Sequence, residues 1–187
     1  MVDWGVKFES ALGYNEFLSQ YGADAHRGRW QAMFDRIQLT DSQQSLLGSF
    51  TREMRVLCMA GAWCGDCVEQ CPILEHFAQA TDGIHLRFVD RDADDEVKQN
   101  LTVCGGARVP QVIFLSEDNQ FVSHFGDRTL PKYRQMAADQ LGDSCPTGLG
   151  PPADSLTSAV VQAWLDEFER VHLILRTSPR LRQIHGD

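Results

Sequence analysis

Long hydrophobic runs, a basic leader segment and an excess of positive charge are all missing from this 187-residue chain. Its longest apolar stretches, such as residues 112–115, are far shorter than the roughly 20 apolar residues that span a bilayer. The first residues show no basic segment followed by an apolar one, as a secretory signal would. The chain has 17 Lys and Arg against 26 Asp and Glu, whereas nucleic-acid binding needs clustered cations. We therefore expect a cytoplasmic protein with no membrane or nucleic-acid partner.

Internal repeats, a second Cys-x-x-Cys pair and clustered histidines are also missing. The chain nevertheless has six cysteines, at positions 58, 64, 67, 71, 104 and 145. A reducing compartment disfavours a structural disulfide framework. The cysteines are therefore expected to be buried packing residues, metal ligands or redox catalysts.

Residues 1–50 have apolar side chains at helix-like spacing, which predicts helices throughout this segment. Phe8 and Leu12 begin the pattern, and Thr40 is typical of a helix N-cap. We find no chemical constellation here. The segment is expected to pack against the rest of the chain or to shape a substrate surface.

Strands and helices alternate after residue 50. The pattern predicts strands at 54–60, 84–90, 111–115 and 121–125, and helices at about 64–80, from 92–96 onward, at 130–141 and at 155–175. The Pro/Gly-rich segment 142–152 is predicted to be a linker or an ordered loop. The first two strands should be parallel with a right-handed crossover, the last two should form a hairpin, and helices should flank both faces.

Cys64 and Cys67 lie three positions apart, where the first strand runs into a helix. Side chains at this spacing are neighbours on a helical turn, so the two sulfurs can meet. Free backbone N–H groups and the helix dipole favour a thiolate at Cys64. This arrangement predicts Cys64 as the nucleophile and Cys67 as the thiol that resolves a mixed disulfide.

A metal site is the alternative for this pair. Zinc requires four ligands, and Cys71 or Cys104 could in principle contribute to a set. The spacing of Cys64, Cys67 and Cys71 is also similar to that of cluster ligands, but neither option has an evident complete set. A lone Cys-x-x-Cys in this context favours redox chemistry, so we expect no metal and no bound cofactor.

The motif at 63–67, Trp-Cys-Gly-Asp-Cys, followed by Pro72, resembles the active-site helix of the thioredoxin superfamily, which usually has Trp-Cys-Gly-Pro-Cys. Val109-Pro110 is similar to its cis-proline loop, and segments 91–110 and 125–128 are similar to a bacterial subgroup of uncharacterised thioredoxin family proteins. The resemblance covers about residues 54–141. It implies an α/β fold of three α/β/α layers with a mixed sheet, within a core at 51–141. A helical extension at 1–50 and a loop and helix at 142–187 would be added to this core.

The resemblance also implies residue roles. Trp63 would contact substrate, and the backbone of Val109, held before a cis Pro110, would bind an incoming chain. The activity would be reduction of protein disulfides, with electrons supplied by another dithiol.

Two positions depart from the family pattern. Cys58 replaces the usual buried acid and is expected to be a small buried hydrophobe. Asp66 replaces the usual proline; it suits the first turn of a helix, and it could also handle a proton near Cys67. Its charge raises the pKa of a neighbouring thiol, which argues for a reductase rather than a strong oxidant.

Three other interpretations remain open. The chain could be a non-catalytic module that presents helices at 1–50 and 155–175 to a partner, or a zinc or cluster protein. Cys104, in the loop before Pro110, could lie close to the active site as an extra redox residue.

Overall fold

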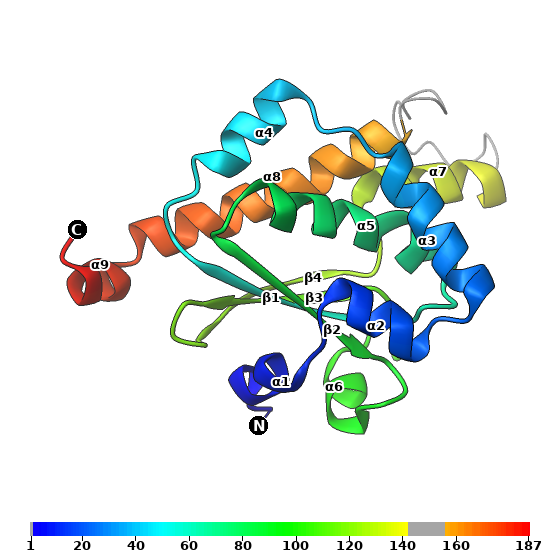
Figure 1. Ribbon diagram of the computed structural model, residues 1–187, viewed down its shortest axis with the longest axis horizontal. Helices are drawn as coiled ribbons and strands as arrows, with labels where there is room; N and C mark the ends of the chain where they lie inside the picture. The colour runs from blue at the N-terminus through cyan, green and yellow to red at the C-terminus, as the bar shows by residue number, and fades with distance from the viewer. Residues whose placement is uncertain (1, 142–155) are drawn as a thin grey trace.

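The computed structural model describes residues 2–141 and 156–187, so Cys145 and the Pro/Gly-rich segment 142–152 lie outside the described residues. Figure 1 shows the element order. The helices and strands are α1 (Trp4–Ser10), α2 (Tyr14–Tyr21), α3 (Asp24–Arg36), α4 (Asp41–Gly48), β1 (Met54–Ala60), α5 (Gly65–Ala80), β2 (Ile84–Asp90), α6 (Asp95–Asn100), β3 (Gln111–Ser116), β4 (Phe121–Gly126), α7 (Leu130–Leu141), α8 (Leu156–Thr177) and α9 (Pro179–His185).

The four strands form one mixed sheet in the order β2-β1-β3-β4. β1 pairs with β2 in parallel, whereas β3 is antiparallel to both β1 and β4. In the view of Figure 1, α5 and α8 lie above the sheet and α1 and α6 lie below it. The predicted α/β architecture, with its parallel pair, hairpin and flanking helices, is confirmed.

The core lies between the sheet and the helices α5 and α8. β1 is buried at every residue except Arg55, and its other side chains are apolar because helices cover both faces of the sheet. Phe168 of α8 packs edge-on against Phe77 of α5 and Phe114 of β3, with ring centroids 5.2 and 5.1 Å apart. Such aromatic pairs add about 1 kcal/mol each beyond the burial of their area. The C-terminal helix is therefore part of the core.

The N-terminal segment is less continuously helical than predicted. Leu12 is extended and exchanges two backbone hydrogen bonds with Phe88, at 2.9 and 2.7 Å, on the outer edge of β2. An edge strand has unpaired N–H and C=O groups, and Leu12 satisfies two of them. The helical spacing of Phe8 and Leu12 was therefore misleading. Thr40 is the N-cap of α4, as predicted.

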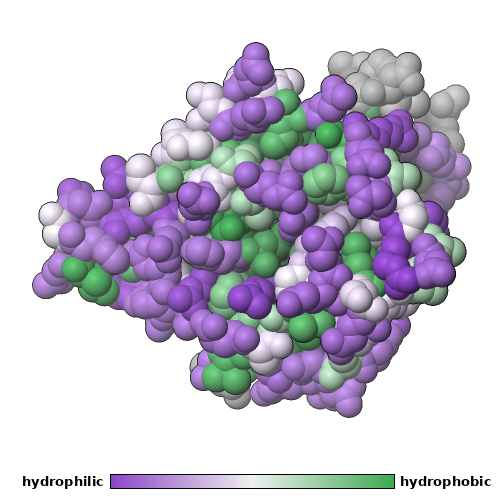
Figure 2. All heavy atoms as spheres, in the orientation of Figure 1, coloured by the Kyte–Doolittle hydropathy of each residue, from purple (hydrophilic) through white to green (hydrophobic). Residues whose placement is uncertain are grey.

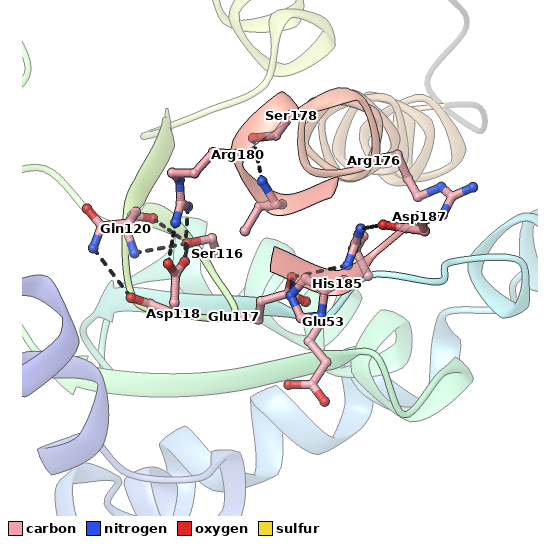
Figure 3. Close-up of polar contacts among 12 residues, drawn as sticks. Glu53, Ser116, Glu117, Asp118, Gln120, Arg176, Ser178, Arg180, His185 and Asp187 are labelled. Atoms are coloured by element: carbon pink, nitrogen blue, oxygen red, sulfur yellow. Dashed lines mark hydrogen bonds and ion pairs between the residues drawn. The ribbon is translucent and has the colours of Figure 1, made fainter. Parts of the chain in front are cut away.

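The C-terminal end includes a short helix, α9, that the sequence pattern did not predict. Figure 3 shows α9 beside the β3–β4 turn. Arg180 donates to the Asp118 carboxylate, with Nη2 and Oδ1 3.1 Å apart, and His185 Nε2 lies 2.5 Å from Glu117 Oε1. These polar contacts fix α9 to the end of the sheet at which β3 turns into β4.

Polar residues cover most of the face shown in Figure 2, and hydrophobic residues are gathered near its middle. No helix within 2–141 and 156–187 combines the length and apolar composition that crossing a membrane requires.

Candidate active site

Three loops meet at one end of the sheet because of the strand directions. β1 and β4 end there, and β3 begins there. Gln111, the first residue of β3, is paired with Met59 on β1 and with Gly126 on β4. The loop before α5, the loop before β3 and the loop after β4 are therefore brought together, although they are distant in the sequence.

Cys64 and Cys67 occupy different environments at this end. Cys64 is the N-cap of α5 and is partly exposed, whereas Cys67 is completely buried. The Cys64 thiol donates to the carbonyl of Val109, with Sγ and O 3.7 Å apart. The backbone N–H of Gly61 donates to Cys67 Sγ at 3.5 Å. The Cys64 sulfur is therefore accessible from the surface, whereas the Cys67 sulfur is enclosed by the protein.

Each of the two thiols affects the pKa of the other. The Cys67 side chain and burial raise the pKa of Cys64, although the backbone N–H groups of Cys67 and Asp66 oppose this rise. Burial disfavours a charge on Cys67, yet the thiols of Cys64 and Cys71 and the N–H of Gly61 together lower its pKa. The helix N-terminus, which was expected to favour a thiolate at Cys64, is thus opposed by burial and by the neighbouring Cys67 thiol.

The bond between Val109 and Pro110 is cis, as the resemblance implied. Val109 is buried, and its carbonyl faces Cys64. Gly126, the last residue of β4, packs against the backbone of this loop. A Cβ at that position would lie 2.5 Å from the carbonyl oxygen of Pro110, and the φ angle of +148° is one that only glycine adopts readily. Glycine at 126 therefore lets β4 approach the cis-proline loop.

Trp63 lies on the rim of the site, and its side chain is 45% exposed. The guanidinium carbon of Arg91 is 4.6 Å from the centre of its ring, and Arg29 donates to its carbonyl at 3.4 Å. A Cβ at Gly61 would lie 2.8 Å from the indole, so the ring packs closely against that backbone. Trp63 is thus held in place while much of its ring stays accessible.

The side chain of Asp66 is bound to the loop after β4. Its carboxylate accepts hydrogen bonds from Arg128, with Nε and Oδ1 3.0 Å apart. Arg128 also donates to the buried carboxylate of Asp127, with Nη1 and Oδ2 3.2 Å apart. Tyr133 and Arg108 donate to the same carboxylate. Although burial opposes it, these donors lower the pKa of Asp127. The result is a charged network that joins the first turn of α5 to the neighbouring loop.

Two buried tryptophans from the flanking helices support the site. Trp30 of α3 donates its indole N–H to the carbonyl of Ala62, 2.9 Å away, in the loop that leads to Cys64. Trp164 of α8 donates to Gln70 at 3.0 Å, and Gln70 in turn donates to the carbonyl of Asp127 at 3.0 Å. The helices outside the central segment therefore fix the loops on both sides of the cysteines.

Sequence reasoning missed these supporting residues. Trp30 and Trp164 fit a helical apolar pattern, which predicts burial and nothing more. The available signal was chemical, because a buried indole N–H needs an acceptor. Arg128 was part of the resembling segment 125–128, but only the fold shows that it reaches Asp66.

The remaining cysteines that the structure describes differ in exposure. Cys58 and Cys71 are completely buried, and Cys104 is exposed in the turn between α6 and β3. Within the described ranges, no three His, Cys, Asp or Glu side chains are grouped so that they could hold a metal ion.

A mixed sheet with paired cysteines at the first turn of the helix after its central strand defines a thioredoxin-like α/β domain. A family model described as thioredoxin matches residues 11–141, and the chain belongs to this family. The match begins well before the segment that carries the motifs. It therefore includes α2, α3 and α4.

Two solved structures have a similar fold. A protein of unknown function from Pseudomonas aeruginosa has a TM-score of 0.69 and 19% identity, and the match covers 91% of this chain and 97% of that one. An HIV epitope scaffold has a TM-score of 0.64 and 18% identity, with 89% and 99% covered. At these identities the likeness concerns the fold alone. No curated protein gives a significant match.

Proposed function

We propose that this protein is a thiol–disulfide oxidoreductase that reduces protein disulfides, with Cys64 as the nucleophile and Cys67 as the resolving thiol. One observation carries the proposal. A partly exposed sulfur at a helix N-cap contacts the carbonyl before a cis proline, and a second, buried sulfur follows it in the first turn of the same helix. Membership of the thioredoxin family supports the same chemistry.

Substrate binding would use the surface around Cys64. The backbone of Val109 and the cis Pro110 would align an extended substrate segment beside the sulfur, and the exposed ring of Trp63 would contact it. Exposed aromatic rings suit this role because they provide apolar area at low entropic cost.

The first step is attack by Cys64 on one sulfur of the substrate disulfide. Its proton passes to Cys67, whose lowered pKa favours the thiolate form that can accept it. The substrate S–S bond breaks, the second substrate sulfur leaves as a thiolate, and a mixed disulfide forms at Cys64. Access decides which cysteine attacks, because Cys67 is completely buried.

In the second step the Cys67 thiolate attacks Cys64 Sγ and releases the substrate thiol. The protein is left with a Cys64–Cys67 disulfide, and the substrate has gained two electrons. Cys67 must lose its proton first, and we assign assistance in this loss to Asp66, whose charge acts on the pKa of Cys67 from the same helical turn. A separate dithiol donor would then restore the reduced pair, in a reducing compartment such as the cytoplasm.

The assay is reduction of a protein disulfide with a dithiol donor in excess. We expect Cys64→Ser to abolish turnover, whereas Cys104→Ser, which removes an exposed cysteine outside the pair, keeps it. Full turnover in Cys64→Ser would overturn the proposal. A Cys64→Ser protein that is folded and inactive but keeps a biological effect would favour the non-catalytic module.

A further inference from the structure

A second pair of sulfurs lies in the core behind the active site. Cys58 comes from the central strand β1, and Cys71 comes from α5. Their Sγ atoms are 3.9 Å apart, and both residues are completely buried. Neither thiol takes a chemical step in the mechanism proposed above.

The second pair lies next to the first. Cys71 is one turn beyond Cys67 on α5, and its thiol is hydrogen-bonded to that of Cys58. Besides burial, the thiols of Cys58 and Cys67 both raise the pKa of Cys71. The cysteines therefore follow one another from the partly exposed Cys64 at the start of α5 to the buried Cys58 on β1.

We propose that Cys58 and Cys71 form a second, buried redox pair that is oxidised by internal exchange with the Cys64–Cys67 disulfide. This inference rests on the proposed function, which supplies that disulfide as the oxidant. The second pair would accept the oxidising equivalent left by one catalytic cycle and return the active-site cysteines to their thiol forms.

The exchange balances in two steps. The Cys71 thiolate attacks Cys67 Sγ, so the Cys64–Cys67 bond breaks, a Cys67–Cys71 bond forms and Cys64 leaves as a thiolate. The Cys58 thiolate then attacks Cys71 Sγ, forming the Cys58–Cys71 bond and releasing Cys67. Two electrons move from the core pair to the active-site pair, and the two protons lost by the core thiols are taken up by the released ones.

Burial sets both the route and the rate of this exchange. Oxidants in solution have no access to fully buried thiols, so the active-site disulfide is the available route. Burial and the neighbouring thiols raise the pKa of Cys71, which keeps the attacking thiolate scarce. The sulfurs of Cys58 and Cys71 must also approach by roughly 2 Å to reach bonding distance. The internal exchange is therefore expected to be slower than attack by Cys64 on substrate.

The functional consequence is a doubled capacity. A fully reduced chain with one redox pair reduces one disulfide before it needs a donor, whereas a chain with two connected pairs reduces two. The protein would thus deliver four electrons in the absence of a donor.

The test counts disulfides reduced per chain. A parent protein carrying Cys104→Ser and Cys145→Ser is fully reduced, freed of reductant and mixed with excess 5,5′-dithiobis(2-nitrobenzoate). We expect the parent to reduce two equivalents in a fast and a slow phase. Added Cys58→Ala should halve the total to one, and added Cys64→Ser should give none.

The outcomes separate the two proposals. One equivalent from the parent, with Cys58 and Cys71 still alkylatable after unfolding, would overturn the second pair and leave the active-site proposal intact. No reduction by the parent would overturn both. Peptide mapping of the oxidised parent provides a check that needs no core variant, because it should identify the Cys58–Cys71 linkage directly.

Discussion

The carboxylate of Asp66 is hydrogen-bonded to the guanidinium of Arg128, with Oδ1 and Nε 3.0 Å apart. This contact joins the first turn of α5 to the loop after β4. Proline, the usual residue at this position in the family, offers no such side-chain acceptor. The charge beside the thiols is therefore balanced, and the active-site helix is tied to the loop that contains Asp127.

The pH dependence of resolution should respond to this pair in opposite directions. The charge of Asp66 raises the pKa of Cys67, so Asp66→Asn should shift the pH profile of mixed-disulfide release to lower pH. Arg128→Gln leaves the carboxylate unbalanced, so the profile should shift to higher pH. Stopped-flow measurement of release across a pH series checks both variants. An unchanged profile in Asp66→Asn would contradict a role for this residue in proton handling.

Trp30 should control the loop that leads to Cys64. Trp30→Phe keeps an aromatic ring in α3 but leaves the buried carbonyl of Ala62 without its donor, at a cost of about 1–3 kcal/mol. We expect a matching loss in urea unfolding and a several-fold lower kcat/KM for disulfide reduction. Trp4→Phe, the same change in α1 away from the site, is the matched control and should keep kcat/KM. Equal rates for the two variants would show that Trp30 has a packing role alone.

Trp164 should act on the other side of the site. Trp164→Phe leaves Gln70 Oε1 without its indole donor, which loosens the contact between Gln70 and the carbonyl of Asp127. The expected stability loss is again about 1–3 kcal/mol. This side supports the loop after β4, which packs through Gly126 against the cis-proline loop rather than against Cys64. We therefore expect KM to rise more than kcat falls. Steady-state kinetics of Trp164→Phe measure both constants. A change confined to kcat would contradict the prediction that this side of the site acts mainly on substrate binding.

The docking of α9 should depend on pH. Arg180 lowers the pKa of Asp118 to about 2, below the value of about 3.9 for an unfolded chain. Folding therefore favours the ionised carboxylate, and its contribution is present above about pH 4 and lost as the pH falls toward 2. Asp118→Asn should be less stable than the wild type at pH 7, and the difference should shrink at pH 3. Urea unfolding at the two pH values measures this, and a constant difference would argue against the ion pair.

Much of the fold was predictable because its signals are local. The apolar run of β1, the break at Gly61 and the following helix define one parallel unit, and the two strands after Pro110 define a hairpin. Leu12 was mispredicted because pairing with the edge of β2 depends on a strand that lies far away in the sequence. Helix α9 was missed although its signals are local, with Ser178 at the N-cap, Pro179 in the first turn and Gly186 after its last residue.

The candidate site was predictable only as far as its motif extends. Residues 63–67 and the pair Val109-Pro110 have recognisable spacing, so their meeting could be anticipated. The environment of the Cys67 thiol could not, because it depends on burial and on contacts such as the Gly61 N–H that only the folded chain supplies. The supporting contacts of Trp30 and Trp164 are likewise tertiary.

The most direct test of disulfide exchange is capture of its intermediate. Cys67→Ser protein is mixed with a disulfide-containing protein substrate, quenched with acid and analysed by non-reducing electrophoresis and peptide mapping. We predict a covalent adduct linked through Cys64 that dithiothreitol dissolves and that Cys64→Ser does not form. No adduct, or one linked through Cys104 in its place, would contradict the assignment of Cys64 as the nucleophile.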